Sequence, residues 1–196
     1  MKNFLYILFF LASFSFVYGQ KEIDLSGDWQ FEIDREDEGV KQSWFSRKLN
    51  DNIKLPGSMQ EHLKGDLPNV NTQWTASLYD SSFFFNPAME RYRLEENFKV
   101  LFFLTPLRHY VGVAWYQKSI DIPKDWKNER IILHLERPHI ETTLWVNNQE
   151  VGMQNSLSVP HIYDITEYAK IGTNTISLRV DNRIKEINVG IDSHSI

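Results

Sequence analysis

Residues 176–180 have the sequence ISLRV, in which apolar side chains alternate with polar ones. In a β-strand successive side chains point to opposite faces of the sheet. Ile176, Leu178 and Val180 therefore lie on one face, while the serine and arginine between them face away. Such alternation is typical of a half-buried strand. The stretch predicts a β-protein whose sheet has one apolar face.

The same alternation recurs in four further segments of the chain. Their apolar residues are Trp29, Phe31 and Ile33; Tyr116, Ile120 and Ile122, in a strand that runs from Val113 to Ile122; Ile131, Leu133 and Leu135; and Leu144 and Val146. Asn147 and Asn148 lie between two apolar runs and can supply the positive φ of a tight hairpin. Closely spaced strands without a βαβ rhythm predict an all-β fold, an antiparallel β-sandwich.

One short helix is expected near the end of the sandwich. Asp164 would cap its N-terminus, Glu167 would complete a capping box, and Gly172 would end it. We expect this helix to close one end of the sandwich.

The first 19 residues differ from the rest of the chain. Lys2 gives a positive start, residues 4–16 are almost entirely apolar, and the small residue Gly19 precedes a polar chain. This order is typical of a secretory signal peptide. The apolar run is shorter than the ~20 residues of a membrane-spanning helix. We expect cleavage after Gly19, leaving a domain over residues 20–196 that makes no contact with the membrane.

The composition limits which cellular compartment and which partners are expected for the protein. The chain has no cysteine, so neither a lipid-anchored cysteine nor a disulfide framework is expected, which favours the periplasm of a Gram-negative bacterium. The formal net charge is -5 and no basic block occurs, which makes nucleic acid a poor partner.

Residues 69–110 form a long irregular insertion. Stretches of this length without regular structure are usually functional or partly ordered. Its aromatic residues either wall a sugar subsite of a partner domain or form a small satellite core, and the sequence leaves both alternatives open.

Six motifs along the chain follow an order known from one enzyme family. They are LSGDWQF (25–31), LPGS (55–58), GVAWYQK (112–118), ETTLWVNNQEVG (141–152), YDIT (163–166) and GTNTISLRVDN (172–182). Together they resemble the N-terminal sugar-binding domain of glycoside hydrolase family 2, which includes β-galactosidases, β-glucuronidases and β-mannosidases. Asn148 stands where this family usually has glycine. Trp115, Tyr116 and Trp145 within the motifs have a structural explanation, because large aromatics pack on sheets.

The resemblance implies a jelly-roll sandwich of the galactose-binding-domain type. Family members are retaining hydrolases that use two glutamates about 5 Å apart, and in the family both lie on a later barrel domain. We therefore expect a fragment of a secreted exo-β-glycosidase, and β-galactosidase is the activity that we expect first for the whole enzyme. The fragment should be inactive by itself. Its expected partners are a terminal β-linked sugar and the catalytic barrel.

The resemblance also nominates Asp192 and His194 as substrate contacts. No catalytic residue, metal ligand or cofactor is expected. Glu95 and Glu96 lie in a charged run that favours solvation. The sequence from His139 to Glu141 is similar to the H-x-E of zinc deaminases, but the cysteine ligands are missing, so we expect a surface pair.

Two other classes of function remain open from the sequence. The first is a stand-alone carbohydrate-binding module that exposes the aromatic residues 83–85. The second is a structural interaction domain with the same sandwich, since fold does not fix function.

Overall fold

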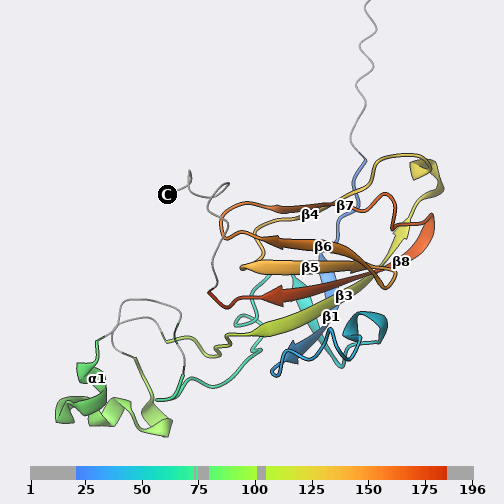
Figure 1. Ribbon diagram of the computed structural model, residues 1–196. Helices are drawn as coiled ribbons and strands as arrows, with labels where there is room; N and C mark the ends of the chain where they lie inside the picture. The colour runs from blue at the N-terminus through green and yellow to red at the C-terminus, as the bar shows by residue number, and fades with distance from the viewer. Residues whose placement is uncertain (1–20, 73, 75–79, 101–104, 185–196) are drawn as a thin grey trace, which may run out of the picture.

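The computed structural model describes residues 21–72, 74, 80–100 and 105–184, so the predicted signal peptide lies outside the described residues. A six-stranded sheet packs against a two-stranded sheet (Figure 1). The strands are β1 (Gly27–Asp34), β2 (Asp51–Leu55), β3 (Val113–Ile122), β4 (Ile132–Leu135), β5 (Glu141–Val146), β6 (Gln149–Asn155), β7 (His161–Asp164) and β8 (Gly172–Asp181). The helices are α1 (Ser82–Phe85) and the short 3-10 helices η1 (Trp44–Ser46), η2 (Pro87–Tyr92), η3 (Glu95–Asn97) and η4 (Lys124–Trp126). Over these ranges no helix has both the length and the apolar character needed to cross a membrane.

The larger sheet has the strand order β2-β1-β3-β8-β5-β6, and β4 pairs with β7 in the smaller one. Every strand pair is antiparallel. The longest pairing joins β3 to β8, from Val113 opposite Asp181 to Ile122 opposite Gly172. The prediction of an antiparallel sandwich is confirmed, and β3 has the predicted bounds.

The core lies between the two sheets and contains the alternating apolar residues. Phe31, Leu144 and Ile176 of the larger sheet are almost completely buried there. Leu133 of β4 and Tyr163 of β7 cover them from the smaller sheet. The period of two in the sequence thus produces one continuous apolar layer.

The turn between β5 and β6 has the predicted hairpin geometry. Asn147 and Asn148 have φ values of 50° and 69°, a region in which asparagine is enriched among non-glycine residues. The Asn147 side chain also accepts a hydrogen bond from the backbone N–H of Thr175 (3.1 Å) and donates one to the backbone oxygen of Tyr168 (3.0 Å). The turn is therefore fixed to β8 as well as to its own hairpin.

The predicted helix after residue 164 is wrong. Asp164 ends β7, and only a single turn follows, in which the N–H of Ala169 donates to the oxygen of Ile165 (2.9 Å). The carboxylate of Asp164 binds the N–H and hydroxyl of Thr166, two residues on, so the capping box with Glu167 does not form. The glycine expected to end the helix opens β8 instead. Ile165 is buried and still closes this end of the core.

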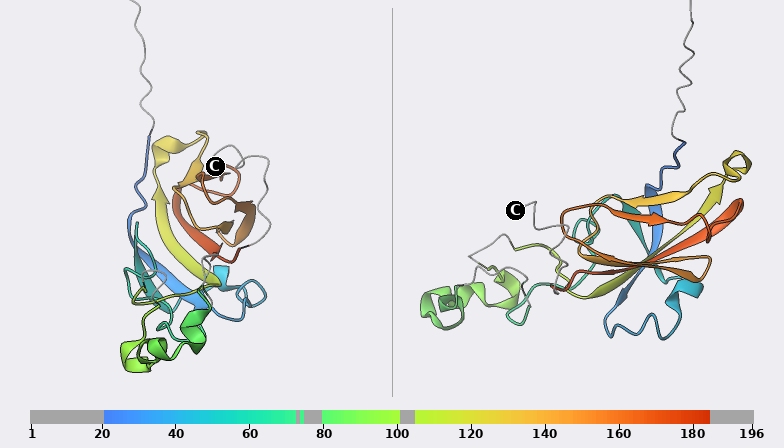
Figure 2. Two further views of the ribbon diagram at one scale, coloured as in Figure 1. Left: turned by 90° about the vertical axis from the view of Figure 1, so that its left-hand side faces the viewer. Right: turned by 45° about the horizontal axis from the view of Figure 1, so that its top comes forward.

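Among the residues that the structure describes, the α-helix lies in the insertion instead. Helices α1, η2 and η3 form a small lobe apart from the sandwich (Figures 1 and 2). Phe83 is buried there with ring contacts to Phe84 (5.1 Å) and Phe98 (6.3 Å), and Arg93 donates to its backbone oxygen. Phe85 is 71% exposed. The lobe therefore has a satellite core of its own, and both Phe84 and Phe85 are exposed on it.

The chain enters and leaves this lobe through one narrow neck. Asp66 and His109 exchange two backbone hydrogen bonds of 2.9 Å each. Arg35 binds the Asp66 carboxylate with two hydrogen bonds of 2.9 and 2.7 Å and so ties the neck to the end of β1. Gly65 has a φ of 105°, and a Cβ atom there would lie 2.9 Å from the His109 oxygen, so glycine permits this close approach.

Candidate functional site

The face of the larger sheet opposite the core is polar and aromatic, yet much of it is buried. The connection between β1 and β2, residues 35–50, folds over it. Gln117, Ser177 and Arg179, which point away from the core, are all buried. We call this surface the outer face. The alternation predicted which residues point outward but not that a loop covers them.

An aromatic cluster occupies the middle of the outer face. The rings of Trp115 and Trp145 have centroids 5.1 Å apart. Phe45 from the covering connection stacks on Trp145 at 5.3 Å with an angle of 6°, and Trp44 contacts Trp115 at 6.3 Å. The prediction that Trp115 and Trp145 pack on the sheet is confirmed.

Asp34 at the end of β1 anchors the covering connection. Its carboxylate accepts hydrogen bonds from the Trp115 indole (3.0 Å) and from the backbone N–H groups of Glu38 (2.9 Å) and Gly39 (2.7 Å). A Cβ atom on Gly39 would lie 2.3 Å from the Trp115 Nε1 atom. The connection can approach the indole this closely only because residue 39 has no side chain.

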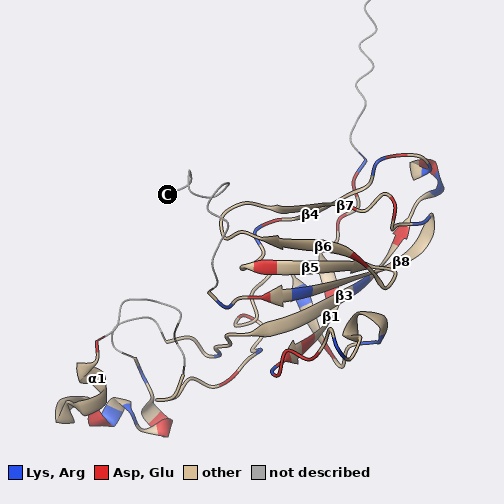
Figure 3. Ribbon diagram, viewed as in Figure 1, with Lys and Arg blue, Asp and Glu red and all other residues tan. Residues whose placement is uncertain are grey.

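A charged network closes the end of the outer face where β8 stops (Figure 3). Arg179 contacts Asp37 (2.7 Å), Glu141 (3.3 Å) and Asp181 (3.4 Å), and its own side chain is 10% exposed. Arg183 contacts Asp37 and Asp181 at 2.6 Å each. Two arginines and three carboxylates from four parts of the chain therefore form one network of ion pairs.

The electrostatics of the network follow from these contacts. Burial raises the pKa of Asp37, but the hydrogen bonds from Arg179 and Arg183 outweigh it and hold that pKa below its usual value. Hydrogen bonds to the carboxylates of Asp181 and Asp37 raise the pKa of Arg183.

The predicted surface pair of His139 and Glu141 is wrong, because the Glu141 side chain is 13% exposed and pairs with Arg179.

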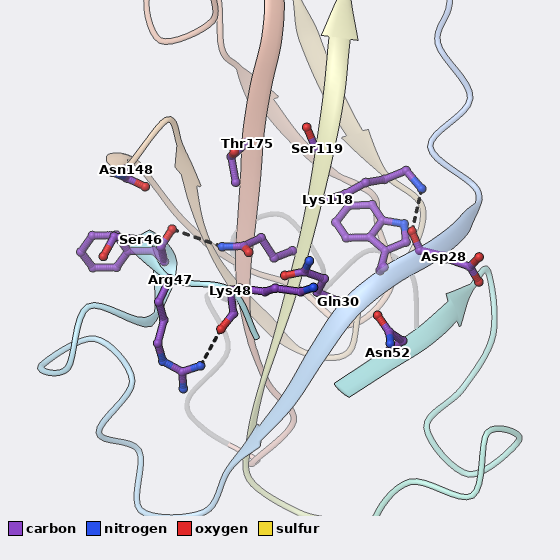
Figure 4. A pocket seen from close by; sticks show the side chains of 13 residues that line it. Asp28, Gln30, Ser46, Arg47, Lys48, Asn52, Lys118, Ser119, Asn148 and Thr175 are labelled. Atoms are coloured by element: carbon purple, nitrogen blue, oxygen red, sulfur yellow. Dashed lines mark hydrogen bonds between the residues drawn. The ribbon is translucent and has the colours of Figure 1, made fainter. Parts of the chain in front are cut away.

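A shallow groove of about 550 Å³ opens on the outer face beside the aromatic cluster (Figure 4). Strands β1, β2, β3 and β8 supply its floor, and residues 45–48 of the covering connection form a wall. It is lined by Asp28, Trp29, Gln30, Phe45, Ser46, Arg47, Lys48, Asn52, Gln117, Lys118, Ser119, Asn148 and Thr175. Most of these side chains are polar, so the groove suits a ligand that forms hydrogen bonds.

The charged side chains of the groove differ in how far they are already engaged. Arg47 binds the carboxylate of Glu32 through two hydrogen bonds of 2.9 Å. The ammonium group of Lys118 donates to the backbone oxygen of Asp28 (3.0 Å). The hydrogen bonds from Arg47 also lower the pKa of Glu32 despite its partial burial.

Other side chains of the groove form no hydrogen bonds or ion pairs of this kind among the described residues. Within the described part of the chain, no side-chain hydrogen bond or ion pair is made by six of the lining residues, namely Asp28, Lys48, Asn52, Ser119, Asn148 and Thr175. These carboxylate, ammonium, amide and hydroxyl groups remain available to a ligand or to water.

The predicted contacts Asp192 and His194 lie outside the described residues, and they stay a prediction. The groove itself was missed, because its polar residues are isolated on different strands and form no motif. Among the residues that the structure describes, no three histidine or acidic side chains are grouped so that they could hold a metal ion.

The fold and the outer face together define a β-sandwich domain with a polar groove on one sheet. The family model for the sugar binding domain of glycosyl hydrolases family 2 matches residues 23–190, so the chain belongs to this family. The resemblance inferred from the six sequence motifs is confirmed.

Two relatives of the chain have different enzyme names. The chain is 24% identical over 160 residues to a β-glucuronidase of Paenibacillus borealis, covering 81% of this chain and 21% of that protein. It is 25% identical over 159 residues to a β-galactosidase of Priestia megaterium, covering 80% and 14%. It therefore spans about a fifth or less of these relatives.

A solved structure supports the fold. The β-glucuronidase from Ruminococcus gnavus superimposes with a TM-score of 0.57 and 21% identity, covering 83% of this chain and 22% of that chain. At this identity the likeness is evidence for the shared sandwich only.

Proposed function

We propose that the chain is the non-catalytic, N-terminal sugar-binding domain of a secreted exo-β-glycosidase, a jelly-roll sandwich that supports a separate catalytic barrel. The observation that carries this proposal is the family match over residues 23–190, which includes every strand of the sandwich. The greater length of the relatives supports the idea that catalysis depends on additional domains.

The described acidic residues support a non-catalytic role. A retaining glycosidase needs two carboxyl groups about 5 Å apart, one of them free to act as an acid and the other as a nucleophile. Asp37, Glu141 and Asp181 lie close together, but each of them is engaged in an ion pair with an arginine. Glu95 and Glu96 are exposed on η3. Neither group has the environment that retaining chemistry requires.

The substrate of the whole enzyme is a terminal β-galactoside or β-glucuronide. The sequence motifs favoured a β-galactosidase, and the names of the relatives support both alternatives. The purified chain should hydrolyse neither nitrophenyl β-galactoside nor nitrophenyl β-glucuronide. Joined to the reading frame that follows codon 196, it should hydrolyse one of them. Turnover by the chain alone that survives purification would contradict the non-catalytic role.

The predicted signal peptide, residues 1–19, is a separate part of the proposal. Expressed in a Gram-negative host, the full chain should appear in the periplasmic fraction with Gln20 as its first residue. A version that lacks residues 1–19 should stay in the cytoplasm. N-terminal sequencing of the two fractions tests the cleavage site, and an uncleaved cytoplasmic product of the full chain would refute it.

A further inference from the structure

We propose that the groove on the outer face is a binding site for an uncharged saccharide. The inference rests on the proposed function as a sugar-binding domain and goes beyond it by naming the surface and the chemical class of the ligand. Three properties of the groove support it: its shape, its hydrogen-bonding groups and the engagement of its arginine.

The shape fits a small sugar. The volume of about 550 Å³ lies within the roughly 300–1,000 Å³ of small-molecule sites. The partly exposed ring of Phe45 lines one wall, where the C–H face of a pyranose can pack on it. Because Phe45 stacks on Trp145, its ring is held in place before any ligand arrives.

The wall and the floor are also fixed to each other. The Gln117 amide donates to the backbone oxygen of Phe45 (3.4 Å) and to the hydroxyl of Ser177 (3.0 Å). The Gln30 side-chain oxygen accepts from the N–H of Leu49 (3.2 Å). A groove held open in this way binds a ligand with little loss of its own conformational entropy.

The hydrogen-bonding groups match those of a sugar. Each sugar hydroxyl both donates and accepts, and so do the amides of Asn52 and Asn148 and the hydroxyls of Ser119 and Thr175. These four groups come from different strands and one turn, and all line the same groove (Figure 4). None of them has a side-chain partner within the described ranges, so a bound saccharide would break no existing contact.

The engagement of the arginine in the groove favours a neutral ligand over a uronic acid. Arg47 is neutralised by Glu32, and Lys118 is directed to a backbone oxygen. Lys48 and Asp28 line the same groove with opposite charges and form no ion pair within the described residues. A uronate carboxylate would therefore find no uncommitted arginine for the paired hydrogen bonds that bind such groups strongly.

The test is isothermal titration of the full chain with methyl β-galactoside, methyl β-glucoside and, as the acidic probe, methyl β-glucuronide. At least one neutral glycoside should bind at millimolar concentration, and more tightly than the glucuronide. Ser119→Trp fills the groove from an exposed position. It should weaken binding at least tenfold while the circular dichroism spectrum stays that of the unmodified chain.

A matched pair of variants tests the hydrogen-bonding step. Asn148 and Asn128 are both exposed and have φ values of 69° and 68°, so glycine is tolerated at either position. Only Asn148 lines the groove. Asn148→Gly should weaken binding about fivefold, the effect of one lost hydrogen bond, whereas Asn128→Gly should leave it unchanged.

Three outcomes would overturn the proposal. Equal binding by Ser119→Trp and the unmodified chain would place the sugar elsewhere and leave the sugar-binding function intact. Preference for the glucuronide would refute the neutral class. Absence of binding by every probe would refute the groove, whereas hydrolysis by the longer reading frame would still support the proposed enzyme.

Discussion

The two faces of the six-stranded sheet are buried by different means. Leu178 and Arg179 are neighbours on β8, and both are buried. Leu178 packs into the apolar layer between the sheets, whereas Arg179 lies under the covering connection and is held by three carboxylates. The inner face is stabilised by the removal of apolar surface from water, which is non-directional. The outer face depends on particular partners at particular distances.

This difference has an energetic consequence. Apolar burial contributes in proportion to area, so the inner face tolerates exchanges of similar size and suffers from lost volume. Hydrogen bonds and ion pairs contribute little net free energy while intact, and a partner left unpaired is strongly unfavourable. The predictions below probe this contrast, beginning with the inner face.

Phe31→Ala should have the largest effect. Phe31 is 1% exposed in the core, and the cavity left by its ring should lower the free energy of unfolding by about 3–5 kcal/mol. Urea denaturation of the full chain measures the change. The control Ile162→Ala, at a residue 51% exposed on β7, should stay within about 0.5 kcal/mol. Equal effects at the two positions would contradict the assigned core.

Asp181→Ala should be the most damaging change on the outer face. The carboxylate is completely buried and accepts hydrogen bonds from Arg179 and Arg183, so its removal leaves these donors without that acceptor and should destabilise the protein by about 3 kcal/mol. Asp125→Ala removes an exposed partner of Lys21 and should have almost no effect. Similar unfolding midpoints for the two variants would show that the network contributes no more than a surface ion pair.

Gly39→Ala should loosen the covering connection. The added Cβ atom would lie 2.3 Å from the Trp115 indole nitrogen and 2.6 Å from the Asp34 carboxylate, which forces the backbone away at about 2 kcal/mol. Tryptophan emission should shift to longer wavelength as water reaches the cluster. Val40→Ala, at an exposed neighbour, is the comparison, and it should leave the emission unchanged.

The smallest expected effect is on acid stability. The pKa of Glu32 is lowered in the folded state, chiefly by the hydrogen bonds from Arg47, and that of Asp37 is lowered by its arginines. A lowered folded pKa contributes stability above the unfolded value of about 4, and this stability is lost as the pH falls. Glu32→Gln should therefore reduce the loss of unfolding free energy between pH 6 and pH 3 by about 1 kcal/mol. Glu36→Gln, at an exposed position, should retain the full slope.

The inner face could be predicted from the sequence because its signal is local. The alternation of residues 113–122 and 176–180 fixes strand, face and burial together, and two asparagines fix the hairpin. The helix expected after Asp164 failed for an equally local reason. Its carboxylate has a nearer partner in Thr166, and an Asx turn formed in place of an N-cap.

The outer face could not be predicted because its contacts are distant in sequence. Glu141 and Arg179 are 38 residues apart, and Asp37 is 142 residues from Arg179. Asn52, Ser119 and Thr175 line one groove from β2, β3 and β8, which become neighbours only through the order of strands. No spacing in the chain carries that information.

The neck formed by Asp66 and His109 has a consequence for how this protein can diversify. The two ends of the lobe are joined by their own pair of hydrogen bonds, so the length of the chain between them has little effect on the stability of the sheets. Closing a loop that is twice as long is less favourable by only about 0.6 kcal/mol. Residues 67–108 are therefore an exchangeable cassette, which selection or an engineer can resize or replace while the β-scaffold keeps its shape.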